Sequence, residues 1–401
     1  MKPLEGIRVL GFENQVAGPY CTMMLAEQGA EVIKIESPGT GDSAREMGPI
    51  VKNAKGEKQS GYFLRFNRNK KGITLDIRKD KGKEIFKELV KVSDVVVENF
   101  RPGLMDKSGL GYDVLKKINP KLIYAGISGF GQMKGFEGPF KDRTAFDMVV
   151  QSMGGLMNNV GEENGSPQWL GIALGNIYSG VMASYGITLA LITRGKTGKG
   201  QYIDVSMYDN IISLNERALT FYSLTGGILA RGRDKLVYPI GPFRVKDGYI
   251  AMIIPIESIW QKLCKVLGRE DLGTDERYNS GPKRAANIDY LQPIIESWLK
   301  DKTKTEAENL LIKKGVPAGQ VQNAKDIFEC PHAKARNMFV EMDDPILGTI
   351  KMVNMPLKMS DVSQTKPNPA PLLGQHNEEI LGSLLKYSKA DIEKMKSEGV
   401  I

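Results

Sequence analysis

Short apolar runs alternate with amphipathic runs along the first third of the chain. Ile7 to Phe12 and Glu31 to Glu36 have the apolar, β-prone character of strands, and Tyr20 to Glu27 between them predicts a helix. The alternation continues with strands expected at Asp94 to Val97 and Leu122 to Ile127. Strands joined through helices are parallel, because each helix carries the chain back to the starting edge of the sheet. The pattern therefore predicts an α/β fold with a parallel sheet covered by helices.

The pattern changes past the middle of the chain. Ile177 to Thr193 predicts a long helix, and a further amphipathic stretch runs from Tyr208 to Leu224. Gly226-Gly227 and the segment Tyr238 to Pro242 then read as loops, so we expect a domain boundary near residue 225. The length of 401 residues also favours two or three domains over one.

A smaller α/β domain is expected after this boundary, starting with a strand at Tyr249 to Ile254. Three helices are predicted near Ser258 to Leu267, Ile288 to Leu299 and Glu306 to Lys314. Two β-prone segments follow at Met338 to Met342 and Thr349 to Val353, and a Pro-rich connection leads to two carboxy-terminal helices.

The composition is that of a soluble globular protein, with 41% hydrophobic and 25% charged residues. The apolar stretches are shorter than the roughly 18 to 20 residues that span a bilayer, and Met1 to Gly6 lacks the pattern of a secretory signal. We therefore expect a cytoplasmic protein with no membrane partner. Three widely spaced cysteines and two histidines offer little material for a disulfide framework, a zinc site or a Ser-His-Asp triad, so no metal is expected.

The 55 basic and 47 acidic residues leave a net charge of +8, which suits nucleic acid, an anionic surface or a phosphorylated ligand. The lysines are scattered without the spacing of nucleic-acid-binding motifs, so nucleic acid is not an expected partner. Phosphate-binding glycine motifs are also incomplete. The turn Asn14 to Pro19 lacks the three glycines of a dinucleotide site, and Gly195-Lys196-Thr197 follows a helix where a P-loop would follow a strand.

Several short motifs resemble those of a known family. They occur in the family's order along the chain and end at residue 376. They are Val16-Ala17-Gly18-Pro19, Glu31 to Glu36, Val97 to Gly103, Ser128 to Gly131, Thr197 to Gln201, Asp204 to Met207, Asp247 to Tyr249 and Pro371 to His376. The set is similar to that of the family III CoA-transferases, which include formyl-CoA and carnitine CoA-transferases. The resemblance covers essentially the whole chain.

The resemblance implies an interlocked homodimer in which each chain threads through its partner. It also implies a large Rossmann-like, CoA-binding domain built from both ends of the sequence, with a small domain between them. We accordingly predict the first part of the large domain, with a linker, at residues 1–225, and the small α/β domain at residues 226–330. A return linker and the rest of the large domain are predicted at residues 331–401. Coenzyme A would be a substrate, carried as an acyl-CoA, and the other partner would be a carboxylic acid.

The resemblance places the coenzyme along the first loops of the large domain. By position, the thioester would be lined by Gln15, Val16 and Ala17. The nucleotide and the pantetheine arm would be flanked by Leu75, Asn99, Phe100 and Arg101, with Lys107 as a candidate phosphate ligand. Without the resemblance, Val16 and Leu75 read as ordinary core residues and Lys107 as a solvated lysine.

The chemistry that the resemblance implies is nucleophilic. An aspartate attacks the thioester to form a mixed anhydride, the CoA thiolate returns to form an aspartyl-CoA thioester, and an acceptor carboxylate reverses these steps. The family pattern Gly-Asp-x-x-x-Gly corresponds here to Gly175 to Gly180, so Asn176 stands at the position of the nucleophile. A neutral amide is a poor nucleophile that nearly fills the shape of an aspartate. The catalytic positions implied are Asn176, Asp147 and Gln15.

The asparagine leaves two hypotheses open. Under the first, an isosteric change at Asn176 traps a CoA ligand in an otherwise ordinary transferase. Under the second, a natural homologue binds acyl-CoA without covalent transfer, or uses another carboxylate. Asp147 is the best substitute, with a structural carboxylate as its alternative role. An α-methylacyl-CoA racemase is a further alternative, but its branch carries a histidine where Phe146 stands. Pro239 to Pro242 reads either as a lid or as the entry to the small domain.

Overall fold

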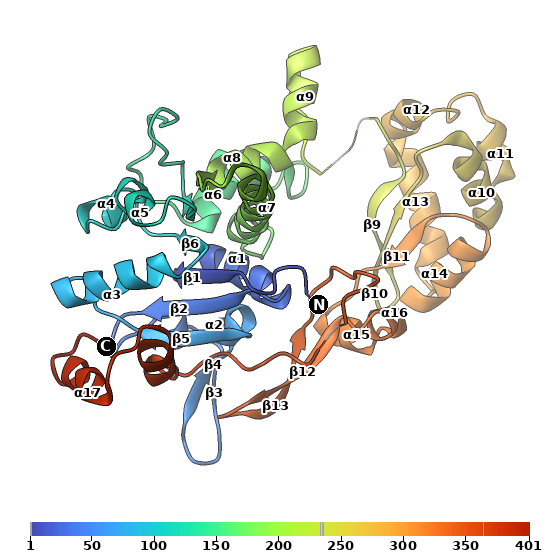
Figure 1. The fold of residues 1–401 in the computed structure, drawn as a ribbon. Coiled ribbons are helices and arrows are strands. Elements are labelled where there is room, and N and C mark those ends of the chain that lie inside the picture. Colours follow the sequence, from blue (N-terminus) through green and yellow to red (C-terminus); the bar gives the residue numbers. More distant parts are fainter. Residues whose placement is uncertain (1, 233, 235, 364) are drawn as a thin grey trace. The chain divides into compact units, whose positions relative to one another are not determined.

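The computed structural model of the chain describes residues 2–232, 234, 236–363 and 365–401 (Figure 1). The chain forms two compact units. The large unit consists of Met1–Met157, Trp169–Glu216 and Ala335–Ile401, and the small unit consists of Asn158–Gln168 and Arg217–Lys334. The functional domain limits at residues 225 and 330 stay a prediction.

The large unit contains most of the strands. They are β1 (Arg8–Phe12), β2 (Glu31–Glu36), β3 (Ile50–Lys52), β4 (Lys58–Ser60), β5 (Lys70–Thr74), β6 (Val95–Glu98), β7 (Ile123–Ser128), β8 (Tyr202–Ser206), β12 (Phe339–Asp344) and β13 (Gly348–Val353). Its helices are α1 (Ala17–Glu27), η1 (Ser43–Glu46), α2 (Gly61–Asn67), α3 (Asp80–Lys91), α4 (Leu104–Lys107), α5 (Tyr112–Ile118), α6 (Asp147–Met153), α7 (Leu174–Thr197), α8 (Met207–Leu214), η3 (Glu379–Leu384) and α17 (Lys389–Ser397). The segments η2 (Leu156–Asn159) and α9 (Glu216–Thr225) span the sequence limits of the two units.

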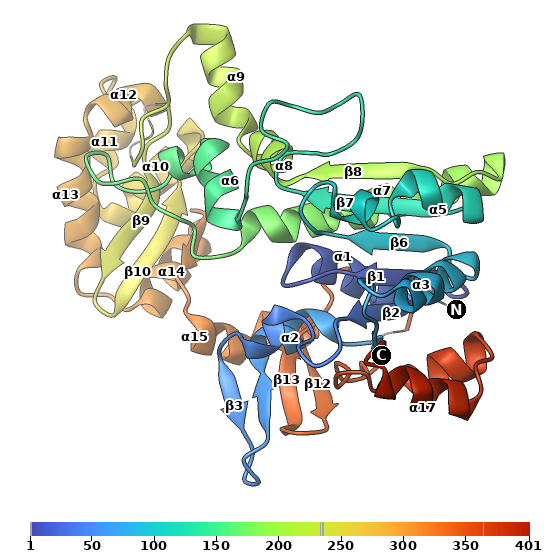
Figure 2. The ribbon, with the colours of Figure 1, turned by 90° about the vertical axis from the view of Figure 1, so that its left-hand side faces the viewer.

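Six parallel strands form the main sheet of the large unit, in the order β5-β2-β1-β6-β7-β8 (Figure 2). The predicted α/β fold with a parallel sheet is therefore confirmed. The chain winds outward from β1 through β2 and β5, and then returns to β6 and winds outward in the other direction. In sheets with this order, the loops after the two central strands part at the carboxyl edge and leave a crevice that binds ligands. Here those loops follow β1 and β6.

Adjacent residues of the central strands belong to two different hydrophobic cores. Val9, Val32 and Val95 pack on the face that α1 and α7 cover. Leu10 and Ile33, their neighbours in sequence, pack on the opposite face with residues of α3, α5 and α17. This alternation follows from the two-residue repeat of a strand. Because both faces are covered, the strands read as nearly continuous apolar runs.

Two helical predictions need correction. The helix predicted at Ile177 to Thr193 begins earlier, at Leu174, so Asn176 lies in the first turn of α7. It also ends later, at Thr197, so Gly195-Lys196-Thr197 forms its last turn and does not follow it. The amphipathic stretch Tyr208 to Leu224 is divided into α8 and α9, with Asn215 between them. Asn215 closes α8, since its backbone N–H donates to the carbonyls of Ile211 and Ile212.

The small unit packs helices on an antiparallel sheet of order β11-β10-β9. Its strands are β9 (Ile240–Val245), β10 (Gly248–Ile253) and β11 (Ala318–Gln320). Its helices are α10 (Glu257–Leu267), α11 (Glu270–Thr274), α12 (Gly281–Ala286), α13 (Ile288–Leu299), α14 (Lys304–Lys313) and α15 (Ala324–Glu329), and α16 (Pro331–Ala335) spans its limit with the large unit. The predicted loop at Tyr238 to Pro242 is wrong in part, because β9 begins at Ile240. Pro242 is tolerated there because β9 is an edge strand, where a missing backbone N–H need not cost a ladder hydrogen bond.

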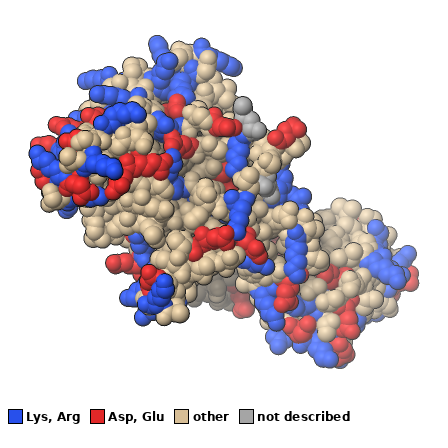
Figure 3. All heavy atoms as spheres, turned by 60° about the horizontal axis from the view of Figure 1, so that its bottom comes forward, with Lys and Arg blue, Asp and Glu red and all other residues tan. Residues whose placement is uncertain are grey.

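Among the described residues, no helix combines the length and the apolar character that crossing a bilayer requires. Lysine and arginine side chains are interspersed with aspartate and glutamate side chains on the face drawn in Figure 3. Such a mixture suits a solvated surface.

Candidate functional site

A cavity of about 430 Å³ lies in the large unit at the carboxyl edge of the sheet. Its wall includes Asn14, Gln15 and Ala17 after β1, Asn99, Phe100, Arg101 and Pro102 after β6, Ile127, Ser128 and Gly129 at the end of β7, Asp142 to Phe146, Asn176 and Met207. The first two groups are the loops that the strand order separates. The cavity therefore occupies the crevice that the topology predicts.

The loop between β1 and α1 is held in an unusual conformation. Gln15 has a φ of 62°, in the left-handed region that non-glycine residues rarely adopt. The next residue, Val16, is the N-cap of α1 and has no polar side chain with which to cap it. Asn99, which follows β6, holds the loop instead: its Oδ1 accepts from the N–H of Asn14 at 2.8 Å, and its Nδ2 donates to the carbonyl of Asn14 at 2.9 Å. The two loops of the crevice are thus tied together.

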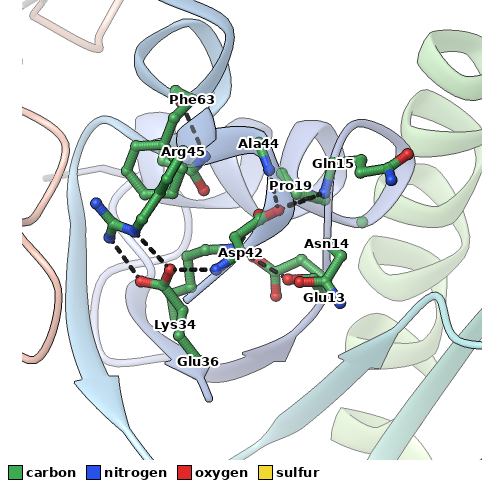
Figure 4. A network of polar contacts seen from close by, with 12 residues as sticks. Glu13, Asn14, Gln15, Pro19, Lys34, Glu36, Asp42, Ala44, Arg45 and Phe63 are labelled. Carbon is green, nitrogen blue, oxygen red and sulfur yellow. Dashed lines mark hydrogen bonds and ion pairs between the residues drawn. The ribbon is translucent and has the colours of Figure 1, made fainter. Parts of the chain in front are cut away.

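A buried network of charged side chains lies behind the same loop (Figure 4). Lys34 on β2 is fully buried; its Nζ lies 2.9 Å from Oδ2 of Asp42 and 3.5 Å from Oε1 of Glu13. Lys70 on β5 contacts the same oxygen of Glu13 at 3.2 Å. Burial lowers the pKa of the Lys70 amine to about 8, although Glu13 opposes this shift.

Each acid of the network contacts at least one base. Glu36 and Arg45 form two hydrogen bonds of 2.7 Å each. Burial acts to lower the pKa of Lys34, but Glu13 and Asp42 outweigh this effect and raise it above its ordinary value. For Asp42, burial acts to raise the pKa, and Lys34 together with two backbone amides brings it below its ordinary value. Asp42 and Lys34 are therefore an ionised pair at neutral pH.

Asn176 is partly buried in the first turn of α7 and reaches the cavity. Its backbone N–H donates to Oδ1 of Asp147 at 3.2 Å. The other oxygen of Asp147 accepts from Nε2 of Gln151 at 2.5 Å and from Nε1 of Trp169 at 3.3 Å. Asp147 thus satisfies a free amide at the start of α7, as helix caps do. The positive end of the α7 dipole faces the cavity, which favours negative charge next to residue 176.

Close packing of α7 on α1 brings Asn176 to the β1 loop. Gly180 makes this approach possible, because a Cβ there would lie only 2.8 Å from the carbonyl oxygen of Ala17 and 3.1 Å from the backbone nitrogen of Cys21. Any side chain at Gly180 would push the two helices apart.

A second hollow, of about 770 Å³, adjoins the first and shares Pro102 and Asp142 with it. Three lysines line it, Lys107, Lys134 and Lys141, together with Tyr112, Tyr124, Tyr202 and the buried carboxyl of Glu98. Burial raises the pKa of Glu98 to about 7. Glu98 also accepts a hydrogen bond of 2.9 Å from the N–H of Phe100, which fixes the start of the loop after β6.

The cavity brings together six of the predicted catalytic and coenzyme-binding residues. They are Gln15, Ala17, Asn99, Phe100, Arg101 and Asn176. Lys107 lines the neighbouring hollow, and Asp147 stands behind Asn176 without forming the cavity wall. Val16 and Leu75 are only 3% and 1% exposed and belong to hydrophobic cores. Within the described ranges, no cluster of three or more His, Cys, Asp or Glu residues suited to a metal ion was found.

Sequence reasoning missed the wall between Asp142 and Thr144 and the buried network around Asp42. Arg143 is an exposed cation at the cavity, but a lone arginine in a polar loop carries no local signal. The signal for the network was present: Lys34 and Glu36 are charges in the buried part of β2, beyond the half-buried Glu31 at its start. A charge in a strand covered on both faces must find a buried partner.

Comparisons with known proteins identify the family of the chain. The family model described as "CoA-transferase family III" matches residues 4–377. The succinyl-CoA:mesaconate CoA-transferase of Haloarcula hispanica is 37% identical over 95% of this chain and 96% of its own length. The succinyl-CoA:glutarate CoA-transferase of Mus musculus is 35% identical over 100% of this chain and 91% of its own.

Solved structures show the same fold. A CAIB/BAIF family protein from Brucella suis superposes with a TM-score of 0.85 at 35% identity, covering 96% of this chain and 99% of that one. Rv3272 from Mycobacterium tuberculosis superposes with a TM-score of 0.82 at 33% identity, covering 94% and 98%. A family model over most of the chain and relatives above 30% identity at nearly full length leave one conclusion: the chain belongs to CoA-transferase family III.

Proposed function

We propose that the cavity beside Asn176 binds an acyl-CoA thioester and a carboxylic acid, between which the family's chemistry moves coenzyme A. One observation carries the proposal. The crevice at the reversal of strand order gathers residue 176, at the amino end of α7, with the loops after β1 and β6 in a single cavity. This arrangement supports an anionic acyl-transfer site, because a helix amino end stabilises the charge that develops when a thioester is attacked.

Within this site, Gln15, Val16 and Ala17 are proposed to surround the thioester, the backbone contributing at Val16. Asn99, Phe100 and Arg101 would flank the pantetheine arm and the nucleotide. Lys107 would reach a CoA phosphate from the neighbouring hollow. The proximity of the two hollows supports this assignment, since CoA is long and carries several negative charges at one end. Leu75 would contribute through its backbone alone, because its side chain is in the core.

The proposed reaction needs a carboxylate at position 176. Its oxygen attacks the thioester carbonyl, the C–S bond breaks, and the CoA thiolate leaves as the mixed anhydride forms. The thiolate then attacks the protein carbonyl of the anhydride, which releases the donor acid as its carboxylate and leaves an aspartyl-CoA thioester. An acceptor carboxylate repeats these steps in reverse, so that no co-reactant is consumed.

Asn176 changes what this chain does on its own. An amide has no negative charge to deliver, so the first step is not available to residue 176 as it stands. Asp147 would be the substitute, but its oxygens already accept from Asn176, Gln151 and Trp169. These contacts support a structural role for Asp147. We therefore propose that the site binds acyl-CoA, and that covalent transfer depends on restoring the carboxylate at 176.

Substrates and assembly are proposed from the relatives and from the surface. Relatives are named for succinyl-CoA, mesaconate, glutarate, D-citramalate, formyl-CoA and oxalate, so dicarboxylic acids are the first acceptors to try. We propose an interlocked homodimer, in keeping with the family resemblance. In support, Tyr185, Leu189 and Ile192 of α7 are 57%, 45% and 56% exposed, which suits a face that another chain covers.

The test measures CoA transfer by the unmodified chain and by Asn176→Asp, with succinyl-CoA and a panel of mono- and dicarboxylic acids. We expect transfer by Asn176→Asp and none above background by the unmodified chain. Transfer by the unmodified chain that is lost in Asp147→Asn would instead favour another carboxylate as nucleophile. If both chains are inactive but bind acyl-CoA tightly, a binding protein without transfer is the better description.

A further inference from the structure

We propose that Asp42 is a positioning residue of this site: its buried carboxylate holds the left-handed backbone of Gln15 and thereby sets the loop that lines the cavity next to Asn176. Oδ1 of Asp42 accepts from the N–H of Gln15 at 3.0 Å, and Oδ2 lies 3.3 Å from the same nitrogen. Asp42 itself does not line the cavity and acts through Gln15. The effect of Asp42 on CoA binding rests on the proposed function, whereas its restraint of Gln15 does not.

Gln15 needs an external restraint. A left-handed conformation is disfavoured for a non-glycine residue, because Cβ crowds the backbone there. Its backbone N–H lies outside the helical ladder of α1, because α1 begins at Ala17. The Gln15 backbone N–H bonds to Asp42, and the Gln15 side chain donates from Nε2 to Oγ of the next residue, Ser43, at 3.3 Å. The loop after β2 is therefore what holds the loop after β1 at this residue.

Asp42 is built to provide that restraint. It is 0% exposed, and both its carboxylate oxygens and its backbone N–H have hydrogen-bond partners. Lys34 contacts Oδ2 at 2.9 Å, and the N–H of Ala44 donates to Oδ1 at 2.9 Å. The N–H of Asp42 donates to Oε2 of Glu36 at 2.9 Å. A charged acceptor makes a hydrogen bond roughly twice as strong as a neutral one, so a carboxylate here restrains the amide of Gln15 better than a carbonyl would.

The surrounding charges explain how an ionised Asp42 is kept in the interior. Figure 4 labels the acids Glu13, Glu36 and Asp42 and the bases Lys34 and Arg45 of the network. Lys70, which contacts Glu13, is the third base. A neutral Asp42 would leave Lys34 in excess. Pairing of this kind stabilises each member only while its partner is present. The amine of Lys34 also donates to the carbonyl of Glu13 at 2.9 Å, so the same lysine ties the start of the β1 loop.

The experiment compares CoA binding by isothermal titration calorimetry in the unmodified chain and in Asp42→Asn. We expect binding about tenfold weaker or more in Asp42→Asn, the loss typical of one charged hydrogen bond. A second variant, Asp42→Ala with Lys34→Met, removes both charges and avoids an unpaired lysine. It is compared with Lys34→Met alone, because the lysine also bonds to the carbonyl of Glu13 in the same loop. The matched control is Glu27→Gln, which weakens the partly buried pair of Glu27 with Arg68 away from the loop. It should lower the melting temperature and leave CoA binding unchanged.

Hydrogen exchange of the Gln15 amide supplies a local readout, and the Glu27→Gln control separates it from general destabilisation. In the unmodified chain this amide should exchange slowly; it should exchange at least tenfold faster in the Asp42 variants and remain slow in Glu27→Gln. Unchanged CoA binding in a folded Asp42 variant would overturn the inference. If neither Asp42 variant folds, the unmodified chain decides: rapid exchange at Gln15 overturns the inference and slow exchange supports it. Failure of the unmodified chain to bind CoA would instead count against the proposed function, and the exchange data would still judge the role of Asp42.

Discussion

Leu75 and Arg101 test whether the cavity or the motif positions define the CoA site. Both residues match positions that the resemblance associates with the coenzyme, but their surroundings are opposite. The Leu75 side chain is 1% exposed and packs in the core with residues of α3 and α17, while Arg101 is exposed at the cavity. Truncating a buried leucine to alanine costs about 2 to 5 kcal/mol of unfolding free energy. Leu75→Ala should therefore lose stability in that range and still bind CoA normally.

Arg101→Ala should behave in the opposite way. An exposed side chain contributes within about 0.5 kcal/mol to stability, whereas a charged contact to a CoA phosphate contributes about 1.5 to 3 kcal/mol to binding. That range corresponds to a dissociation constant about 10- to 150-fold larger. Urea unfolding gives the first quantity and titration calorimetry the second, at a temperature where both variants are folded. The reasoning is refuted if Leu75→Ala weakens CoA binding tenfold, or if Arg101→Ala leaves it unchanged.

Two further predictions concern packing and pH. Gly180→Ala should lower the free energy of unfolding by about 1 to 3 kcal/mol, because the new Cβ meets the backbone of α1. Urea unfolding measures this loss. A loss below about 0.5 kcal/mol would mean that α1 and α7 are not in close contact. The pKa of Glu98 is raised to about 7, so the folded state holds a proton that the unfolded state releases, and stability should fall as the pH rises from about 4.5 to about 7. Glu98→Gln should lack this fall in unfolding curves measured across the same range; an equal slope in both chains would contradict the assignment.

Elements of both units could be predicted from periodicity. The strand predicted at Glu31 to Glu36 has the limits of β2, and the helix predicted at Ile288 to Leu299 has those of α13. These segments succeed because tertiary packing agrees with local pattern. The predicted loop at Tyr238 to Pro242 fails in part because two prolines outweigh the strand pattern, whereas an edge strand has room for a proline.

The site was predictable only where a motif marked it. Gln15, Ala17 and Asn99 carried a family signal and do meet at the cavity. Asp42 lies 27 residues from Gln15 in sequence, and nothing local to Gly41-Asp42-Ser43 indicates that its carboxylate folds back onto the preceding loop. Contacts between residues that are distant in the chain depend on the order of the strands, which a single sequence does not display. The same reason hides Arg143 from a sequence reading.

The central claim is that residue 176 is where the thioester meets the protein. The most direct measurement is intact-mass spectrometry of Asn176→Asp and of the unmodified chain after incubation with succinyl-CoA and the other acyl-CoA donors. We predict an adduct of one CoA less one water on Asn176→Asp, located at residue 176 by peptide mapping and removed by hydroxylamine. We predict no such adduct on the unmodified chain. An adduct at another residue, or none on Asn176→Asp with any donor, would contradict this claim.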